Sequence, residues 1–356
     1  MDLADTTTVG LDLGSTGARA VEVSWQGERP SVTRWAVLDF EEPVNDWDNV
    51  NAAELGSKIG EALRKRGLRN PLVAHSVSGK SVVPQYFNFP QLMDEDVAEA
   101  VRIEVEAGLP FRLEDTLFTY ILFPDQRTVP GKARTHGLAI AADGALVEAR
   151  LNVIRSAKLE PFCVETDATA CANAFIATRS KPTYEGAVAL LNIGHRYTNL
   201  ALLGGDGTLL MRDVPWAGGQ LTQRIAELLD IPADLAARLK ELHWEKGPAE
   251  AKELEPHMAD LLQSGVQDLV ARLRDTIHYW VSERLVPALG MVYITGGGAL
   301  VRGLPELLSD ALSVPVERWS PVKGLTTQKD GRIVTWDYRL AVAYGLALRR
   351  FERNRT

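Results

Sequence analysis

The chain has 356 residues, of which 46% are hydrophobic, and a formal net charge of -8 at pH 7. This size is enough for two domains with buried cores, and the acidic balance argues against a nucleic-acid-binding surface, which is normally basic. No apolar run reaches the roughly 18 residues of a membrane-spanning helix, and only two cysteines occur. We therefore expect a cytoplasmic protein without a signal peptide, in which any membrane role would come through a partner.

The first predicted element is a strand, a tight turn and a second strand between Val9 and Val23. Asp12 lies at the end of the first strand, before the run Gly14-Ser15-Thr16-Gly17. A carboxylate in this place can hold a metal-bound water near a triphosphate, and the glycines let backbone N–H groups approach phosphate. The alternative is an ordinary hairpin with an acidic residue and two turn glycines, which is common in proteins.

Two amphipathic helices follow. Asn51 and Glu54 form a capping pattern, and Gly67 marks the end of that helix. The apolar face of this first helix consists of Leu55, Ile59 and Leu63. Residues 94–96 are all acidic and favour the N-terminus of a second helix. The apolar face of the second helix consists of Val97, Val101 and Val105.

A second strand-turn-strand pattern lies near the middle of the chain. Asn192-Ile193-Gly194 ends one strand, and residues 200–203 form the next. In both copies a short polar residue, an aliphatic residue and a glycine precede the turn. In both copies a further turn follows, at Gln26-Gly27 and at residues 205–207. These shared features favour a duplicated domain, although any α/β protein contains several such units.

Two further glycine clusters precede predicted helices. Gly218 and Gly219 stand before an apolar helical face, and a helix N-terminus behind glycines is a natural anion site. A simple helix start is an equally good explanation. The run Gly296-Gly297-Gly298 follows a predicted strand, and three successive glycines exceed what a strand-to-helix turn requires. We therefore favour the close approach of a base or ribose at this second cluster.

The longest predicted helix begins near Val266 and keeps helical spacing of apolar residues to Leu285, with Pro287 near its end. Together the elements predict an α/β fold. We expect a first domain over residues 1–183 with an inserted subdomain at 83–158. A second domain over 184–336 would contain a helical insertion at 220–290. Residues 337–356 are expected to return to the first domain as a C-terminal helix.

These patterns together resemble the actin-like ATPase superfamily and, within it, the PilM family of type IV pilus assembly proteins. The resemblance is carried by the two hairpins, by Leu109-Pro110-Phe111, by residues 215–222 and by the glycines at 296–298. It implies two ribonuclease-H-like domains around a nucleotide cleft, with ATP and Mg²⁺ as ligands. It also implies a cytoplasmic adapter, peripheral to the inner membrane, that binds the N-terminal peptide of a PilN-like membrane protein and contacts other pilus inner-membrane and motor components.

The resemblance assigns roles to individual residues. Asp12 would hold Mg²⁺ through water, Asp167 would position the attacking water, and Lys240 remains from a motif that contacts ribose. A charge that stabilises a helix N-terminus is an equally good explanation of Asp167. The other nucleotide contacts expected from the resemblance are Gly14, Ser15, Thr16, Gly17, Arg19, Asn192, Gly194, Gly218, Gly219, Gly296, Gly297 and Gly298.

Three residues depart from the pattern of the family. Asn192 stands where an Asp is usual, Arg19 where a Lys is usual, and Ala237 where a ribose-contacting Glu is usual. Loss of one metal-organising carboxylate would slow hydrolysis about 10²–10³-fold, by analogy with the removal of one preorganised electrostatic group. We therefore expect weak ATP binding and very slow or absent hydrolysis.

Two alternative functions remain open at this point. An active ATPase or small-molecule kinase of the same superfamily is favoured by Asp12 and disfavoured by Asn192 and Ala237. An FtsA-like filament protein associated with the membrane would carry an amphipathic C-terminal helix after a linker. Residues 349–356 contain a single aromatic residue and no such pattern, although their basic side chains could touch acidic lipid.

Overall fold

The structure is a computed structural model that describes residues 7–27, 29–70, 72–124, 134–178, 186–246, 255–282, 288–323, 326–329, 332–335 and 337–350. Two compact units are present. The first unit comprises Met1–Ser180, Ala201–Arg212 and Val342–Thr356, and the second comprises Lys181–Leu200 and Asp213–Ala341. The domain boundaries expected after residues 183 and 336 lie outside the described residues, as do Leu285, Pro287 and residues 351–356.

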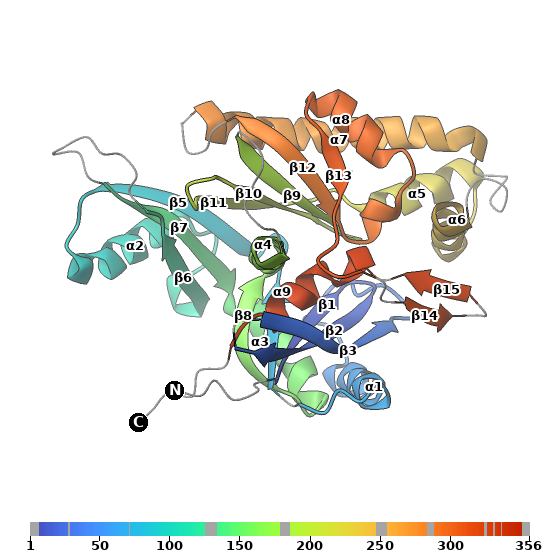
Figure 1. Ribbon diagram of the computed structural model, residues 1–356, viewed down its shortest axis with the longest axis horizontal. Coiled ribbons are helices and arrows are strands. Elements are labelled where there is room, and N and C mark those ends of the chain that lie inside the picture. The colour runs from blue at the N-terminus through green and yellow to red at the C-terminus, as the bar shows by residue number, and fades with distance from the viewer. Residues whose placement is uncertain are drawn as a thin grey trace. The chain divides into compact units, whose positions relative to one another are not determined.

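The first five-stranded sheet has the order β3-β2-β1-β4-β8 (Figure 1). Its strands are β1 (Thr7–Gly14), β2 (Gly17–Gln26), β3 (Arg29–Asp39), β4 (Leu72–Val77) and β8 (Glu160–Thr166). β1 pairs antiparallel with β2 and parallel with β4. Gly14 is opposite Gly17 in this register, so Ser15 and Thr16 alone form the turn. The first predicted hairpin is therefore confirmed, with Asp12 opposite Arg19 near its closed end.

The second five-stranded sheet repeats this order as β11-β10-β9-β12-β13. Its strands are β9 (Ala187–Ile193), β10 (Thr198–Leu203), β11 (Leu209–Val214), β12 (Leu289–Thr295) and β13 (Val316–Arg318). β12 pairs parallel with both β9 and β13, and its register places Thr295 beside Asn192. In each sheet three consecutive strands lie side by side, and the first of them also pairs with a later strand: β1 with β4 in the first sheet and β9 with β12 in the second. The duplicated strand-turn-strand pattern predicted from the sequence is thus present.

Helices α1 (Ala52–Lys65) and α3 (Gly144–Ser156) pack against the first sheet. Asn51 caps α1 by accepting a hydrogen bond from the backbone N–H of Glu54 at 3.2 Å, as the sequence pattern predicted. Both helices bury their apolar faces in one core with β1 and β4. The members of this core include Val9, Leu11, Leu13, Ile59, Leu63, Val73, Val153 and Ile154.

A smaller three-stranded sheet has the order β5-β7-β6. It consists of β5 (Val82–Pro90), β6 (Thr116–Leu122) and β7 (Arg134–Asp143), with a short 3-10 turn, η1 (Leu113–Asp115), before β6. Helix α2 (Asp94–Gly108) covers one face of it, and the predicted face Val97, Val101 and Val105 is buried there (Figure 1). On edge strand β6, Leu117 and Ile121 are 48% and 41% exposed, because alternate side chains of a strand point to opposite faces.

The helices of the second unit are α5 (Gly218–Leu229), α6 (Ala233–Lys246), α7 (Glu255–Ser282) and α8 (Leu304–Leu312). Helix α7 begins at Glu255, well before the predicted start near Val266. The reason is that Met258 and Leu262, one helical turn apart, are also buried and extend the apolar face toward the N-terminus. The remaining elements are η3 (Gly297–Leu300), β14 (Thr326–Lys329), β15 (Arg332–Thr335) and η4 (Asp337–Leu340).

Helix α9 (Ala341–Ala347) packs against β1 and against α4 (Asp167–Thr178) by direct backbone contact. A Cβ atom on Gly10 would lie 2.0 Å from the carbonyl oxygen of Ala343, and one on Gly345 would lie 1.8 Å from that of Ala170. Real Cβ atoms do not approach backbone so closely, so both positions require glycine. These two contacts fix α9 beside the strand that carries Asp12.

We predict that Gly10→Ala destabilises the protein by about 3 kcal/mol, because the added methyl group meets rigid backbone on α9. Gly205→Ala is the matched control, since nothing lies within 4 Å of its Cβ position, and its effect should stay within about 0.5 kcal/mol. Urea denaturation of both variants measures the difference. Equal stability of the two variants would contradict the close contact.

Candidate functional site

Two carboxylates of the first unit meet at the closed end of the first hairpin. Asp12 lies on β1 and Asp167 is the first residue of α4, and their charges interact. The hydroxyl of Ser76, on β4, donates to Oδ1 of Asp167 at 2.6 Å. The structure therefore brings together the two residues that the sequence and the resemblance suggested as catalytic.

The carboxyl of Asp12 has an unusual protonation equilibrium. Burial, the largest cause, and the nearby charge of Asp167 raise the pKa of Asp12 to about 7, against the opposing charges of Arg19 and Arg150. A carboxyl with such a pKa changes its charge near neutral pH, and a cation beside it would favour the ionised form. This donor set fits a magnesium ion held through water by Asp12. Among the described residues, no group of three or more His, Cys, Asp or Glu side chains gathers to ligate a metal directly.

Arg150, on α3, is a buried cation that bonds the backbone of the two strands carrying Asp12 and Ser76. Its Nη1 donates to the carbonyl oxygen of Leu13 at 2.6 Å and to that of Ser76 at 3.3 Å. Its guanidinium lies 4.5 Å from the ring centre of Trp47, close enough for a cation–π interaction. Arg150 thus joins the ends of β1 and β4, from which Asp12 and Ser76 project.

Glu165 is engaged elsewhere, although it lies only two residues from Asp167. Its carboxylate accepts hydrogen bonds from Thr169 at 2.9 Å and from Asn173 at 3.0 Å, and it forms an ion pair with Arg349. The side chain of Glu165 is almost fully buried in this network. Of the two acidic residues in this segment, Asp167 is the one whose charge reaches Asp12.

The first turn is held tightly in the first unit. The carbonyl oxygens of Ser15 and Thr16 accept hydrogen bonds from the backbone of Val44 and Phe40. Gly17 has a packing reason of its own, since a Cβ there would lie 2.4 Å from the carbonyl oxygen of Leu38. Arg19 folds back on the hairpin, where its Nη1 donates to the carbonyl oxygen of Gly17 at 2.9 Å. A Cβ on Gly14 would lie 3.2 Å from the same nitrogen.

The second hairpin holds a chain of side-chain amides. Nδ2 of Asn192 donates to Oδ1 of Asn199 at 2.8 Å, and Nδ2 of Asn199 donates to Oδ1 of Asp213 at 2.7 Å. Asn192 is partly exposed, while Asn199 is buried. Position 192 therefore lacks the carboxylate that the family pattern places there. The acidic residue of this hydrogen-bonded row is Asp213, which is linked to Asn192 through Asn199.

The backbone at the start of α5 is occupied by the second hairpin. The N–H groups of Gly218 and Gly219 donate to the carbonyl oxygens of Gly194 and His195, at 3.0 and 2.7 Å. Both N–H groups are thus already used in hydrogen bonds within the second unit. The anion site that the sequence pattern suggested at this helix start stays a prediction. Both glycines lie tightly against the hairpin, and a Cβ on Gly219 would be 2.6 Å from the His195 carbonyl oxygen.

The side chain of Lys240, on α6, contacts the start of α5. Its Nζ donates to the carbonyl oxygen of Gly218 at 2.8 Å and also bonds the hydroxyl of Thr222. Burial, the largest cause, lowers the pKa of Lys240 to about 8, and the charge of Arg339 lowers it as well. Burial and the charge of Lys240 lower the pKa of His195 to about 4. The charge of Arg196 also lowers the pKa of His195, so Lys240 and Arg196 supply the positive charge at this turn while His195 is neutral.

Packing explains two glycines of the third cluster. Gly296 has φ of +80°, and a Cβ there would lie 2.5 Å from Oδ1 of Asn192. A Cβ on Gly298 would lie 2.2 Å from a methyl carbon of Ile193. Gly297 alone has open space around its Cβ position. The excess of glycine noted in the sequence thus reduces to one residue, Gly297, where a ligand could approach closely.

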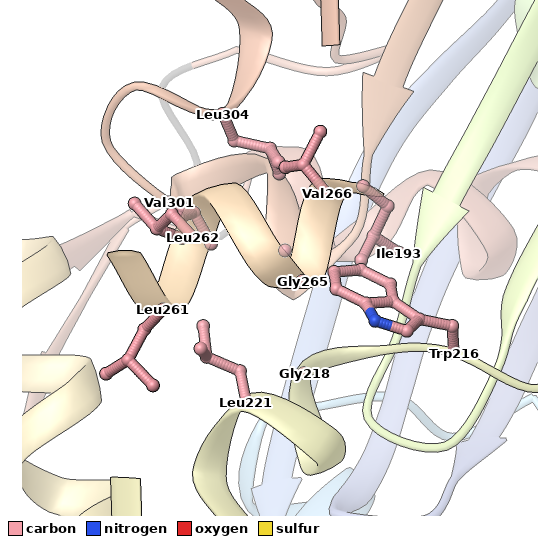
Figure 2. A pocket seen from close by; sticks show the side chains of 11 residues that line it. Ile193, Trp216, Gly218, Leu221, Leu261, Leu262, Gly265, Val266, Val301 and Leu304 are labelled. Carbon is pink, nitrogen blue, oxygen red and sulfur yellow. The ribbon is translucent and has the colours of Figure 1, made fainter. Parts of the chain in front are cut away.

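A small cavity lies behind these glycines in the second unit. Figure 2 shows Trp216 beside both Ile193 and the turn of α7 that carries Gly265, with Gly218 and Leu221 nearby. The cavity measures about 20 Å³, room for roughly one water molecule, whereas ligand pockets usually measure about 300–1,000 Å³. It is a packing space of the second unit and is too small for a nucleotide base.

A model of the family described as type IV pilus assembly protein PilM matches residues 10–351. The chain belongs to the PilM family. One similar solved structure is the PilM-PilN type IV pilus biogenesis complex, at 24% identity and a TM-score of 0.77, covering 96% of this chain and 97% of that chain. Another is the ethanolamine utilization protein EutJ from Carboxydothermus hydrogenoformans, at 18% identity and a TM-score of 0.58, covering 98% and 91%.

The PilM family carries the actin-like fold that the sequence patterns implied, so that expectation is confirmed. In the described part of this PilM-family chain, no helix combines the length and the apolar character needed to cross a bilayer. Sequence reasoning missed four residues that shape the site: Ser76, Arg150, Asn199 and Asp213. Ser76 stands near the end of β4, as Asp12 does on β1, but the sequence analysis predicted no strand there. The others are common polar residues with no motif around them.

We predict that Asp12→Asn changes how stability depends on pH. The pKa of Asp12 is about 7 in the folded protein and near 3.8 when unfolded, so the folded state loses stability as the pH rises between these values. At pH 8 the variant should exceed the wild type by about 1–3 kcal/mol, and at pH 4 the two should be similar. Thermal unfolding without nucleotide measures this, with exposed Asp310→Asn as the control. Parallel pH profiles for wild type and Asp12→Asn would contradict the raised pKa.

Proposed function

We propose that this chain is a cytoplasmic actin-like adapter in the inner-membrane complex of a type IV pilus or a related secretion or DNA-uptake machine. It binds ATP weakly, hydrolyses it very slowly or not at all, and holds the N-terminal peptide of a PilN-like membrane protein. The observation that carries this proposal is the PilM-family match over residues 10–351. The similarity to the PilM-PilN complex over 96% of the chain supports a PilN-like partner.

The paired carboxylates of the first unit support ATP and Mg²⁺ as ligands. Asp12 would hold a hydrated magnesium ion, which supplies charge neutralisation to a bound triphosphate. Asp167, oriented by the 2.6 Å hydrogen bond from Ser76, would accept a hydrogen bond from a water molecule or other nucleophile. Within the first unit, the turn residues Ser15 and Thr16 are the proposed contacts to phosphate.

The second unit supports weak hydrolysis. Asn192 brings no charge to this hairpin, and its NH₂ group is held by Asn199. Ala237, on α6, cannot make the ribose contact for which the family uses a Glu. These substitutions remove charged groups that preorganise a phosphoryl-transfer site, while Asp12 and Asp167 remain. Nucleotide would therefore serve to set conformation rather than to supply energy by rapid turnover.

The small sheet of the first unit supports the peptide site. Strand β6 is at the edge of the sheet β5-β7-β6, and it exposes Leu117, Ile121 and Leu122. An edge strand offers unpaired backbone groups, and its exposed aliphatic side chains offer apolar contacts for a peptide's apolar residues. The strongly acidic residues of α2 would attract a basic peptide to the same subdomain.

A second candidate function is favoured by one observation. The raised pKa of Asp12 beside Asp167 resembles the tuning of catalytic carboxyl pairs, so an active ATPase or small-molecule kinase remains the alternative. A phosphate-release assay with saturating Mg-ATP distinguishes the two. A turnover of about 1 s⁻¹ or more, lost in Asp167→Asn, would replace the adapter by an enzyme.

The nucleotide prediction is tested by calorimetric titration with Mg-ATP. We expect micromolar to near-millimolar affinity, lost by at least about tenfold in Asp12→Ala, because the hydrated cation loses its anchor. Exposed Asp310→Ala should bind as the wild type does. Undetectable binding by the wild-type protein would mean that nucleotide has no part in its function.

The peptide prediction uses two equally exposed leucines. Leu117 on β6 and Leu228 on α5 are each 48% exposed, so Leu117→Asp and Leu228→Asp should lower the free energy of unfolding by similar, small amounts. We expect only Leu117→Asp to weaken binding of a synthetic PilN N-terminal peptide, by about tenfold or more, in a fluorescence anisotropy titration. Equal binding by both variants would move the peptide site away from β6. The titration repeated with Mg-ATP tests whether nucleotide changes peptide affinity.

A further inference from the structure

The amide chain of the second hairpin has a direction. Asn199 is only 3% exposed and has one NH₂ group and one carbonyl oxygen in its side chain. Its NH₂ group is directed to Asp213, at 2.7 Å, because a carboxylate can only accept. Its oxygen must then face Asn192, which answers with its own NH₂ group at 2.8 Å. The charge of Asp213 thus determines the orientation of two successive amides.

The end of this chain is the carbonyl oxygen of Asn192. It lies toward Gly296, where a Cβ would be only 2.5 Å away. The N–H of Gly296 does not donate to it, since that group donates to the carbonyl oxygen of Tyr338 at 2.9 Å. Among the described residues no hydrogen bond reaches this oxygen, and Asn192 is partly exposed. It is an oriented acceptor that is neutral and accessible.

An Asp at position 192 would conflict with this arrangement. Asn199 could direct its NH₂ group to Asp213 or to an aspartate at 192, but not to both on the present geometry. In either orientation its carbonyl oxygen would face a carboxylate, which is unfavourable in a buried place. Asp213 therefore explains, in physical terms, why this protein has an amide at position 192, where its family usually has an acid.

We propose that Asp213 is a positioning residue which, through Asn199, makes position 192 present a neutral carbonyl oxygen to the ligand. Such an oxygen accepts from a ligand hydroxyl or from a metal-bound water and adds no negative charge. This second unit therefore recognises a hydrogen-bond donor of the nucleotide or its hydrated cation, and contributes little to metal affinity. The ligand part rests on the proposed function, whereas the orientation of the amides does not.

The orientation is tested by a double-mutant cycle of thermal stability without nucleotide, at pH 8. Asn192→Asp should lower Tm by about 3 °C or more in the wild-type background, because two carboxylates compete for one amide. In the Asp213→Asn background the same change should cost less than about 1 °C, since Asn199 can turn over and satisfy both neighbours. Asn152→Asp, on the exposed surface of α3, controls for the added charge. Additive losses would overturn the proposal.

The ligand part is tested by the metal dependence of ATP affinity. The double variant N192D/D213N keeps the net charge but places the carboxylate at the accessible end of the chain. The ratio of ATP affinities with magnesium and with EDTA should rise about tenfold over the wild type. An unchanged ratio would overturn the ligand assignment. If the wild-type protein binds no ATP at all, the proposed function fails, while the stability cycle still decides the role of Asp213.

Discussion

The arrangement of the first unit depends on one buried cation. The guanidinium of Arg150 bonds the carbonyl oxygens of Leu13 and Ser76, and it lies over Trp47. A buried guanidinium with an anchor on two strand ends sets the spacing between them, because its planar donors have a fixed geometry. Asp12 and Ser76 project from those ends, and Ser76 in turn orients Asp167. The carboxylate pair is therefore a consequence of how α3 packs on the first sheet.

The duplicated sheets carry different chemistry at equivalent hairpins. In the first, Asp12 is surrounded by Asp167, Arg19 and Arg150, so charge dominates and the pKa of Asp12 is raised. In the second, the amides of Asn192 and Asn199 transmit an orientation from Asp213 without bringing its charge to position 192. The same strand order thus supports a titratable carboxyl at position 12 and an uncharged amide at the equivalent position 192. This asymmetry supports the proposed adapter, in which a nucleotide would set conformation.

Much of the fold could be predicted from local patterns, and much of the site could not. The Asn51 cap, the Val97-Val101-Val105 face and both hairpins follow from short-range rules of helix capping and strand periodicity. The predicted start of α7 near Val266 was too late, because the buried apolar face continues toward the N-terminus through Met258 and Leu262 with fewer apolar residues per turn. Arg150 and Asp213 could not be found, since their roles arise only when α3 meets β1 and β4 and when β11 lies beside β10. Gly296 and Gly298 have a packing reason that the sequence does not reveal, because a Cβ there would meet Asn192 or Ile193. Their contact with a nucleotide stays a prediction.

The position of Trp216 makes it an internal optical reporter. Its indole is buried beside Gly218 in an apolar space that Gly298 also lines, and no carbonyl or carboxylate among the described residues accepts its N–H. An indole in such surroundings emits at shorter wavelength than one in water. Because the ring lies against Gly265 of α7 and lines the same cavity as Gly218 and Gly298, a small displacement of these segments alters its emission. The protein therefore carries its own fluorescent sensor for conformational change in the second unit, with Trp216→Phe as the reference.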